Sequence, residues 1–292
     1  MTTQPLRLMA VHAHPDDESS KGAATMARYA AEGERVRVVS CTGGERGDVL
    51  NPHLADDPAV RDDMPAYRRR EMDAAARALG IEHVWLGFID SGLPEGDPLP
   101  PLPEGCFAVQ PLEVTVGALV REIREFRPHV MTTYNENGGY PHPDHLMCHT
   151  VSMAAFEAAA DAEQFPEAGE PWRVEKIYYD VGFSPDRFEA IATAMHERGL
   201  VSPFDDWLSA RSELPRRPVS ARIHCAEYFE RRDEALRAHA TQIDPDGFFF
   251  MVPRDIEREV WPYEEFELAR SHVETTTPED DLFAGVREKV RP

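Results

Sequence analysis

Two short segments of the chain, 12–18 and 138–145, are rich in histidine and aspartate. We interpret His14, Asp17 and His145 as the ligands of one metal ion, because two imidazoles and a carboxylate are a common catalytic zinc set. Such a set leaves a fourth position open for water, and zinc lowers the pKa of that water to about 7. The same donors also accept ferrous iron. The sequence therefore predicts metal-assisted hydrolysis, with Zn²⁺ or Fe²⁺ as the cofactor.

The neighbours of these ligands are candidates for acid–base chemistry. Asp16 and Asp17 are adjacent, and consecutive side chains of an extended segment point in opposite directions. We therefore assign Asp16 as the general base, because it can reach the attacking water beside the metal. His142, as an imidazolium, is the candidate acid for the departing amine, and Asp144 is the candidate partner that orients its ring. The phenol of Tyr140 is a candidate donor to the developing oxyanion.

A single histidine or aspartate in a loop is normally a solvated surface residue. Two clusters at the ends of two predicted strands need a common explanation, and one site explains both. His12 fits packing at least as well as a supporting role behind the metal. The other histidines are interpreted as structural or surface residues: His53, His83, His129, His149, His196 and His272.

The elements that must position these residues predict an α/β fold. Short apolar runs alternate with helical patterns in the first half of the chain, which is typical of βαβ units and a mostly parallel sheet with helices on both faces. Ligands bind beyond the carboxyl ends of the strands in such a sheet, where both clusters lie. The predicted strands are 6–13, 35–41, 83–88 and 128–134, and the predicted helices are 23–31, 67–79, 112–126 and 145–160.

The second half of the chain is less regular. We predict a catalytic core over 1–165 and a smaller C-terminal α+β portion over 166–292 that completes the substrate pocket. The tail after Thr275 is predicted to be a loosely held terminus. The strands predicted in this half are 176–182 and 220–225, and the helices are 186–198 and 227–240.

Composition excludes several classes of function. The net charge of −22 opposes binding to nucleic acid. No apolar run approaches the roughly 18 residues of a membrane span, and the first residues do not resemble an export signal. The four cysteines are scattered, which fits a reducing compartment and a cytoplasmic location. No feature of the sequence specifies an oligomeric state.

Residues 13–18 together with 142–145 resemble the paired motifs of the LmbE-like (PIG-L) deacetylase family. The resemblance implies a zinc-dependent enzyme with a Rossmann-like fold that removes acyl groups from amino sugars. It also implies the same roles for the metal ligands, the base, the acid and the oxyanion donor assigned above.

A narrower resemblance is to the branch of this family that acts on S-conjugates of mycothiol. It implies hydrolysis of the amide between cysteine and glucosamine in a small thiol–sugar conjugate, a detoxification that releases an N-acetylcysteine S-conjugate and glucosaminyl-inositol. The alternatives are N-acetylglucosaminyl-inositol deacetylation, deacetylation of another amino sugar and, more remotely, a non-catalytic metal- or sugar-binding module. The segments that carry this resemblance are 9–22, 42–47, 85–92, 134–141, 237–245 and 265–271.

Four residues are implied as substrate contacts by the same resemblance. Lys21 is at a position where the resemblance implies serine in the deacetylase branch and lysine in the amidase branch. From the residues alone, it is expected to be a surface lysine on a helix. Asp48, Arg68 and Asp90 occupy the positions implied for sugar binding, and Glu45 is ranked below Asp48. Arg68 and Glu71 are also one helical turn apart, a spacing that fits a structural ion pair.

Overall fold

The protein is described by a computed structural model that covers residues 4–210 and 216–290. A seven-stranded sheet with the order β3-β2-β1-β4-β5-β7-β6 forms its centre. Strands β3, β2, β1, β4 and β5 are parallel, whereas β7 runs antiparallel to both of its neighbours. The strands are β1 Arg7–His12, β2 Arg35–Thr42, β3 Glu82–Phe88, β4 Val130–Thr133, β5 Lys176–Asp180, β6 Ala221–His224 and β7 Tyr263–Ser271.

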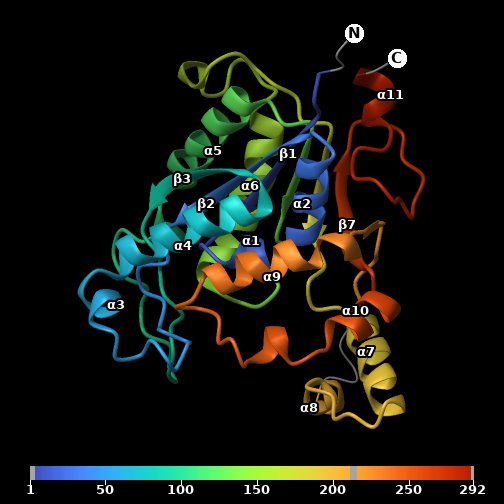
Figure 1. Cartoon of the computed structure of the whole chain (residues 1–292). Helices are drawn as coiled ribbons and strands as arrows, with labels where there is room; N and C mark the ends of the chain where they lie inside the picture. Colours follow the sequence, from blue (N-terminus) through green and yellow to red (C-terminus); the bar gives the residue numbers. More distant parts are fainter. Residues whose placement is uncertain (1–3, 211–215, 291–292) are drawn as a thin grey trace.

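Helices cover both faces of this sheet (Figure 1). Alternate residues of β1 serve the two layers, because successive side chains of a strand point to opposite faces. Leu8 and Ala10 pack with one layer, and Met9 and Val11 with the other. The first layer contains α2 Ala23–Ala31, α4 Met64–Leu79 and α9 Phe229–Ala238, and the second contains α5 Leu112–Phe126 and α6 Pro143–Ala158.

The remaining helices lie outside these two layers or are short. A small apolar cluster holds α7 Pro185–Glu197, α8 Asp205–Ala210 and α10 Arg254–Val260 together beside the main sheet (Figure 1). The short helices are α1 Asp17–Ser20, α3 Pro58–Asp62, α11 Val286–Val290 and the 3-10 turns Phe107–Val109, Pro166–Ala168, Ala226–Tyr228 and Phe248–Phe250. No helix within the described residues is both long enough and apolar enough to cross a membrane.

The α/β fold class predicted from the sequence is confirmed. Helix α6 begins at Pro143, so His142 is its N-cap and His145 lies in its first turn. Strand β7 was not predicted, although it lies between β5 and β6 and joins β6 to the sheet. The division of the chain near residue 165 stays a prediction.

The prediction of a loosely held tail is wrong. Leu282, Phe283 and Val286 are fully buried in the core that also contains α2. The Tyr29 hydroxyl accepts a hydrogen bond from the Leu282 N–H at 2.8 Å and donates one to Asp281 at 2.8 Å. These apolar side chains anchor the tail, and the acidic residues 279–281 directly before them mask that pattern in the sequence.

Candidate metal and catalytic site

The predicted clusters converge where the strand order reverses between β1 and β4. His14 follows β1, and His142 and His145 follow β4 at the same edge of the sheet. The ring centroids of His14 lie 4.6 Å from His142 and 5.2 Å from His145. The structure therefore brings His14 into one buried group with His142 and His145, from which it is far apart in the sequence.

Asp17 lies between two of these rings. Its Oδ2 is 3.5 Å from His14 Nδ1 and 3.5 Å from His145 Nε2. Donors bound tetrahedrally at about 2.0–2.2 Å from a zinc ion stand roughly 3.3–3.6 Å apart, so these spacings suit one ion. His145 Nδ1 lies 2.8 Å from the Gly138 carbonyl, whereas Nε2 is buried without a hydrogen-bond partner among the described residues. A nitrogen fixed in this way is suited to a metal ligand.

The surrounding carboxylates favour a cation at this point. His14 Nε2 is 3.2 Å from Asp144 Oδ2 and 3.4 Å from Asp90 Oδ1. Burial alone lowers the pKa of His14, but hydrogen bonds to Asp144, Asp17 and Asp90 raise that pKa well above its ordinary value. The residues present therefore fit a divalent metal. The donor atoms of His14, His142 and His145 lie close enough together to share one ion, and so do those of His14, Asp90, His142 and Asp144; Asp17 belongs to neither of these two groups.

Two side chains that lie behind Asp17 hold its carboxylate in place. Lys21 Nζ is 2.7 Å from Asp17 Oδ1, and the Tyr134 hydroxyl donates to Oδ2 at 2.6 Å. Burial favours a higher pKa for Asp17, but the charges of Lys21 and His145 hold that pKa well below its usual range. Lys21 is only 9% exposed, so the interpretation as a surface lysine is wrong. Tyr134 was not singled out from the sequence, although it lies in a segment that carried the resemblance.

Arg68 is a buried partner of the candidate base. It is 2% exposed, and its Nη2 lies 2.9 Å from Asp16 Oδ2. The same guanidinium donates to the carbonyls of Gly44 at 2.8 Å and Pro15 at 2.5 Å. Asp16 itself has a φ of 114°, a conformation that the surrounding contacts must maintain. Burial raises the pKa of Asp16, and the charge of Arg68 opposes that rise.

The alternative pairing of Arg68 with Glu71 does not form. Glu71 instead accepts hydrogen bonds from the amide and hydroxyl of Thr241, both at 2.7 Å. Nearby, Glu18 Oε1 lies 2.6 Å from His239 Nε2, and Glu18 Oε2 accepts the Asp16 amide at 2.9 Å. The segment after α9 thus supports the loop that carries the base, which sequence reasoning missed.

His142 differs from its predicted cationic form. Its Nδ1 accepts a hydrogen bond from the Asp144 amide at 3.1 Å, so the neutral ring carries its proton on Nε2. Burial and the charges of His14 and His145 lower the pKa of His142 to about 4. The Asp144 carboxylate accepts from the Ser91 amide at 2.8 Å and faces His14. The Asp144 carboxylate therefore contacts His14, and its role in orienting the ring of His142 stays a prediction.

Tyr140 borders the open side of the site. Its side chain is 45% exposed, and its ring centroid lies 4.6 Å from that of His145 and 6.0 Å from that of His142. Partial burial and the charge of Asp17 raise the pKa of Tyr140, so its phenol stays protonated. His12 is packed instead, with both ring nitrogens buried and without hydrogen-bond partners in the described part of the chain.

The residues implied for sugar binding differ in how close they lie to the candidate site. Asp90 is 2% exposed, and its oxygens accept from the Gly92 amide at 2.8 Å and the Arg46 amide at 3.0 Å. Glu45 accepts the Asp90 amide at 3.0 Å, which brings it to the edge of the site. Asp48 is exposed, and its main-chain carbonyl accepts a hydrogen bond from the Gln242 side chain. Glu45 is thus nearer to the imidazole group than the higher-ranked Asp48.

The chain is similar in sequence to known proteins along most of its length. Residues 9–156 match the family described as PIG-L, GlcNAc-PI de-N-acetylase. The mycothiol S-conjugate amidase of Streptomyces coelicolor is 59% identical over 98% of this chain and 99% of its own length. The 1D-myo-inositol 2-acetamido-2-deoxy-alpha-D-glucopyranoside deacetylase of Geodermatophilus obscurus is 40% identical over 97% of this chain and 99% of its own.

A solved structure has a similar arrangement of elements. The N,N'-diacetylchitobiose deacetylase of Pyrococcus horikoshii aligns with a TM-score of 0.60 over 90% of this chain and 83% of its own. Its sequence is only 16% identical, so this similarity concerns the fold alone.

Proposed function

The chain belongs to the PIG-L family, and we propose that it is an amide hydrolase that cleaves S-conjugates of mycothiol between the cysteine carbonyl and glucosamine. The observation that carries the hydrolase is the buried donor group of His14, His142 and His145, with the carboxylate of Asp17 3.5 Å from two of these rings and a second carboxylate, Asp16, next to Asp17 in the chain. We propose His14, Asp17 and His145 as the metal ligands. The 59% identity to the amidase supports the substrate. The products would be an N-acetylcysteine S-conjugate and glucosaminyl-inositol, which fits a role in detoxification.

Zn²⁺ is the proposed cofactor, with Fe²⁺ as the alternative for the same donors. When bound, the ion would polarise the amide carbonyl and make a water molecule acidic near neutral pH. All four cysteines are buried and free, which supports a reducing location such as the cytoplasm.

Asp16 is the proposed base. It takes a proton from water as the oxygen attacks the amide carbon, and it gives that proton to the glucosamine nitrogen as the C–N bond breaks. Arg68 keeps the carboxylate aimed at the site through its bond to Asp16 Oδ2. One carboxyl group can therefore serve both proton transfers, so no charged imidazole is needed.

Neutral His142 presents Nε2–H as a hydrogen-bond donor. We therefore propose that His142 and the Tyr140 phenol stabilise the oxyanion of the tetrahedral intermediate. Protonation of the amine by His142, as expected from the sequence, becomes the alternative. Asp48, Asp90 and Glu45 remain candidates for the sugar hydroxyls.

The deciding experiment compares metal-loaded protein on a mycothiol S-conjugate and on N-acetylglucosaminyl-inositol. A higher kcat/KM on the conjugate supports the amidase. A higher value on the acetylated sugar assigns the chain to the deacetylase branch. Absence of turnover on both compounds points to another acylated amino sugar as the substrate. Bound metal without turnover of any acylated amino sugar would support a binding module.

Lys21 is the proposed determinant of that choice. Its ammonium group touches Asp17, and the resemblance places serine at this position in deacetylases. We expect Lys21→Ser to lower the ratio of conjugate to acetylated-sugar activity about tenfold, because a charge-assisted hydrogen bond from this ammonium group to the conjugate would contribute roughly 1.5–3 kcal/mol. Lys289→Ser is the control, since Lys289 is 42% exposed and pairs with Glu175 elsewhere. Equal losses on both substrates would remove Lys21 as a determinant.

A further inference from the structure

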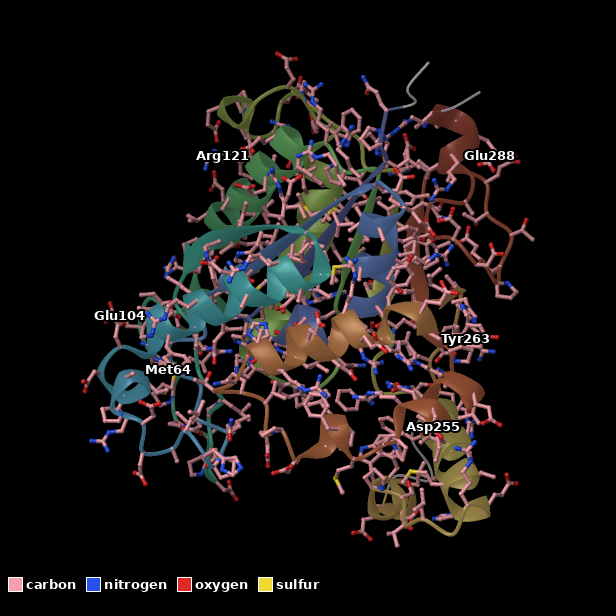
Figure 2. The ribbon with its side chains drawn as sticks, viewed as in Figure 1. Met64, Glu104, Arg121, Asp255, Tyr263 and Glu288 are labelled. Carbon is pink, nitrogen blue, oxygen red and sulfur yellow. The ribbon has the colours of Figure 1, made fainter. Side chains whose placement is uncertain are left out.

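A second hollow opens beside the metal group, on the far side of Lys21. Its walls come from the start of α2, the end of β5, and the elements α7, α9, α10 and β7. Tyr263, labelled in Figure 2, lines it at the start of β7 next to α10. The hollow is therefore built mainly by the second half of the chain, outside the motifs that hold the metal donors.

Lys21 forms the wall between this hollow and the reaction site. Its Nζ lies 2.7 Å from Asp17 Oδ1, whereas its Cγ lies 3.7 Å from where a Cβ on Gly182 would stand. Lys21 and Gly182 both line the hollow. A substrate whose amide carbon sits at the metal donors thus needs to reach only past one lysine side chain to enter it.

Aromatic rings line the hollow and its mouth. Phe188 and Phe204 are buried and stacked, with centroids 4.2 Å apart and an interplanar angle of 13°. Phe183 and Phe248 stand in front of them with centroids 6.3 Å apart, yet they are 47% and 40% exposed. Exposed aromatic side chains around a hollow are typical of a ligand site, particularly on a chain with a net charge of −22.

The arginine side chains that line the hollow already form ion pairs with carboxylates of the protein. Glu257 accepts hydrogen bonds from Arg187 at 2.5 Å, from Arg232 at 2.8 Å and from Arg254 at 2.9 Å. Arg254 also pairs with Asp233 at 2.6 Å. These guanidinium groups have carboxylate partners within the protein, so no anionic ligand is needed to balance their charge.

Asp180 is the exception among the carboxyl groups of the lining. It is 8% exposed, and neither of its oxygens has a hydrogen-bond partner in the described residues. Glu257, Glu264 and Glu265, which also line the hollow, all accept hydrogen bonds. Burial raises the pKa of Asp180 to about 8. A buried carboxyl group without partners at a cavity wall is a place where a ligand can supply the missing hydrogen bond.

We propose that this hollow binds the S-linked substituent of the conjugate, that it selects apolar and preferably aromatic groups, and that Asp180 at its neck hydrogen-bonds the acetamido N–H of the cysteine. The proposal rests on the amidase function. Only Cα, Cβ and sulfur separate the reacting carbonyl carbon from the substituent, so the substituent must lie close to the metal donors. The hollow behind Lys21 meets that requirement and has the matching aromatic lining.

The test compares S-benzyl and S-methyl mycothiol as substrates. We expect the double variant Phe183→Ala with Phe248→Ala to lower the benzyl-to-methyl ratio of kcat/KM at least roughly tenfold, because a benzyl group loses much of its apolar contact in the variant whereas a methyl group loses little. Both rings are partly exposed, so the variant should fold. Leu112→Ala, 44% exposed on α5, is the control and should leave the ratio unchanged. Equal losses on the two substrates, or an unchanged ratio, would overturn the proposal.

A binding measurement separates failure of this proposal from failure of the amidase function. Calorimetry with N-acetyl-S-benzylcysteine requires no turnover, so it remains informative if neither conjugate is hydrolysed. We expect binding to the parent protein and at least roughly tenfold weaker binding to the double variant and to Asp180→Ala, which removes the hydrogen-bond acceptor. Absence of binding to the parent, or equal binding to all three proteins, would overturn the aromatic subsite.

Discussion

Glu18 and His239 form a fully buried pair, with Oε1 and Nε2 2.6 Å apart, although 221 positions separate them in the sequence. Glu18 also accepts the amide of Asp16, the proposed base. Burial lowers the pKa of His239, but the Glu18 carboxylate more than offsets this and raises it above its ordinary value. The pair thus fastens the C-terminal half of the chain to the loop that carries the catalytic carboxylate.

Removing His239 should therefore destabilise the whole protein. We expect His239→Ala to lower the free energy of unfolding by about 3–5 kcal/mol, because the Glu18 carboxylate would stay buried without its partner. Urea titration at pH 7 measures this loss. His196→Ala is the control, since its pair with Asp205 is exposed and should contribute below about 1 kcal/mol. Similar losses in the two variants would contradict the role of the buried pair.

The sequence predicted the fold well where periodicity is strong. Helices Ala23–Ala31 and Leu112–Phe126 have the predicted bounds, and the strands that precede His14 and His145 end at one edge as expected. The supports of the site were harder to find because they are long-range. No residue near Glu18 in the sequence indicates that His239 is its partner. Likewise, no residue near Asp16 indicates that Arg68 pairs with Asp16 and not with Glu71. Strand β7 was missed because exposed and buried residues do not alternate regularly along it.

The C-terminal tail should contribute to stability through Phe283. This ring is fully buried and meets Tyr29 of α2 edge to face, with centroids 5.0 Å apart. We expect Phe283→Ala to lower the free energy of unfolding by about 3–5 kcal/mol, measured by urea titration. Val290→Ala, at a position 39% exposed on α11, should change it by less than about 0.5 kcal/mol. A tail that hardly packs would give the same small effect in both variants.

Arg68 should act on turnover more than on substrate binding. Its guanidinium joins Asp16 to the carbonyls of Gly44 and Pro15, a forked geometry that lysine cannot reproduce. We expect Arg68→Lys to lower kcat roughly ten- to hundredfold with little change in KM, because misplacing a base costs rate. Arg70→Lys, an exposed neighbour on α4, is the control. A raised KM with unchanged kcat would instead support the sugar contact implied by the family resemblance.

Metal analysis should distinguish the role of Asp16 as a base from the role of His14 as a metal ligand. We expect Asp16→Ala to retain its metal but to lose turnover by about 10²–10⁴-fold, because it removes a proton acceptor. His14→Ala should lose both metal and turnover, since His14 is a proposed ligand. Metal content by mass spectrometry, read beside kcat, distinguishes these outcomes, and adding a chelator should abolish turnover of the parent protein. Full metal-dependent activity in Asp16→Ala would remove the general-base assignment.

Asp180 should make the protein less stable as the pH rises. Burial raises its pKa from 3.8 to about 8, with Glu264 and Asp17 adding to the rise and Lys21 opposing it. Between these values the folded chain holds a proton on Asp180 that the unfolded chain has released. The contribution of Asp180 to the free energy of unfolding therefore falls with pH by up to about 1.4 kcal/mol per unit, and the loss is complete above pH 8.

Asp180→Asn removes this titration while keeping the shape of the side chain. We expect the free energy of unfolding of the variant, relative to the parent, to increase between about pH 6 and pH 8, because only the parent loses stability in that window. Urea titrations of both metal-free proteins across the window measure the difference and leave metal release out of the comparison. Parallel curves for the two proteins would mean that Asp180 is ionised in the folded chain, with Lys21 as its effective partner.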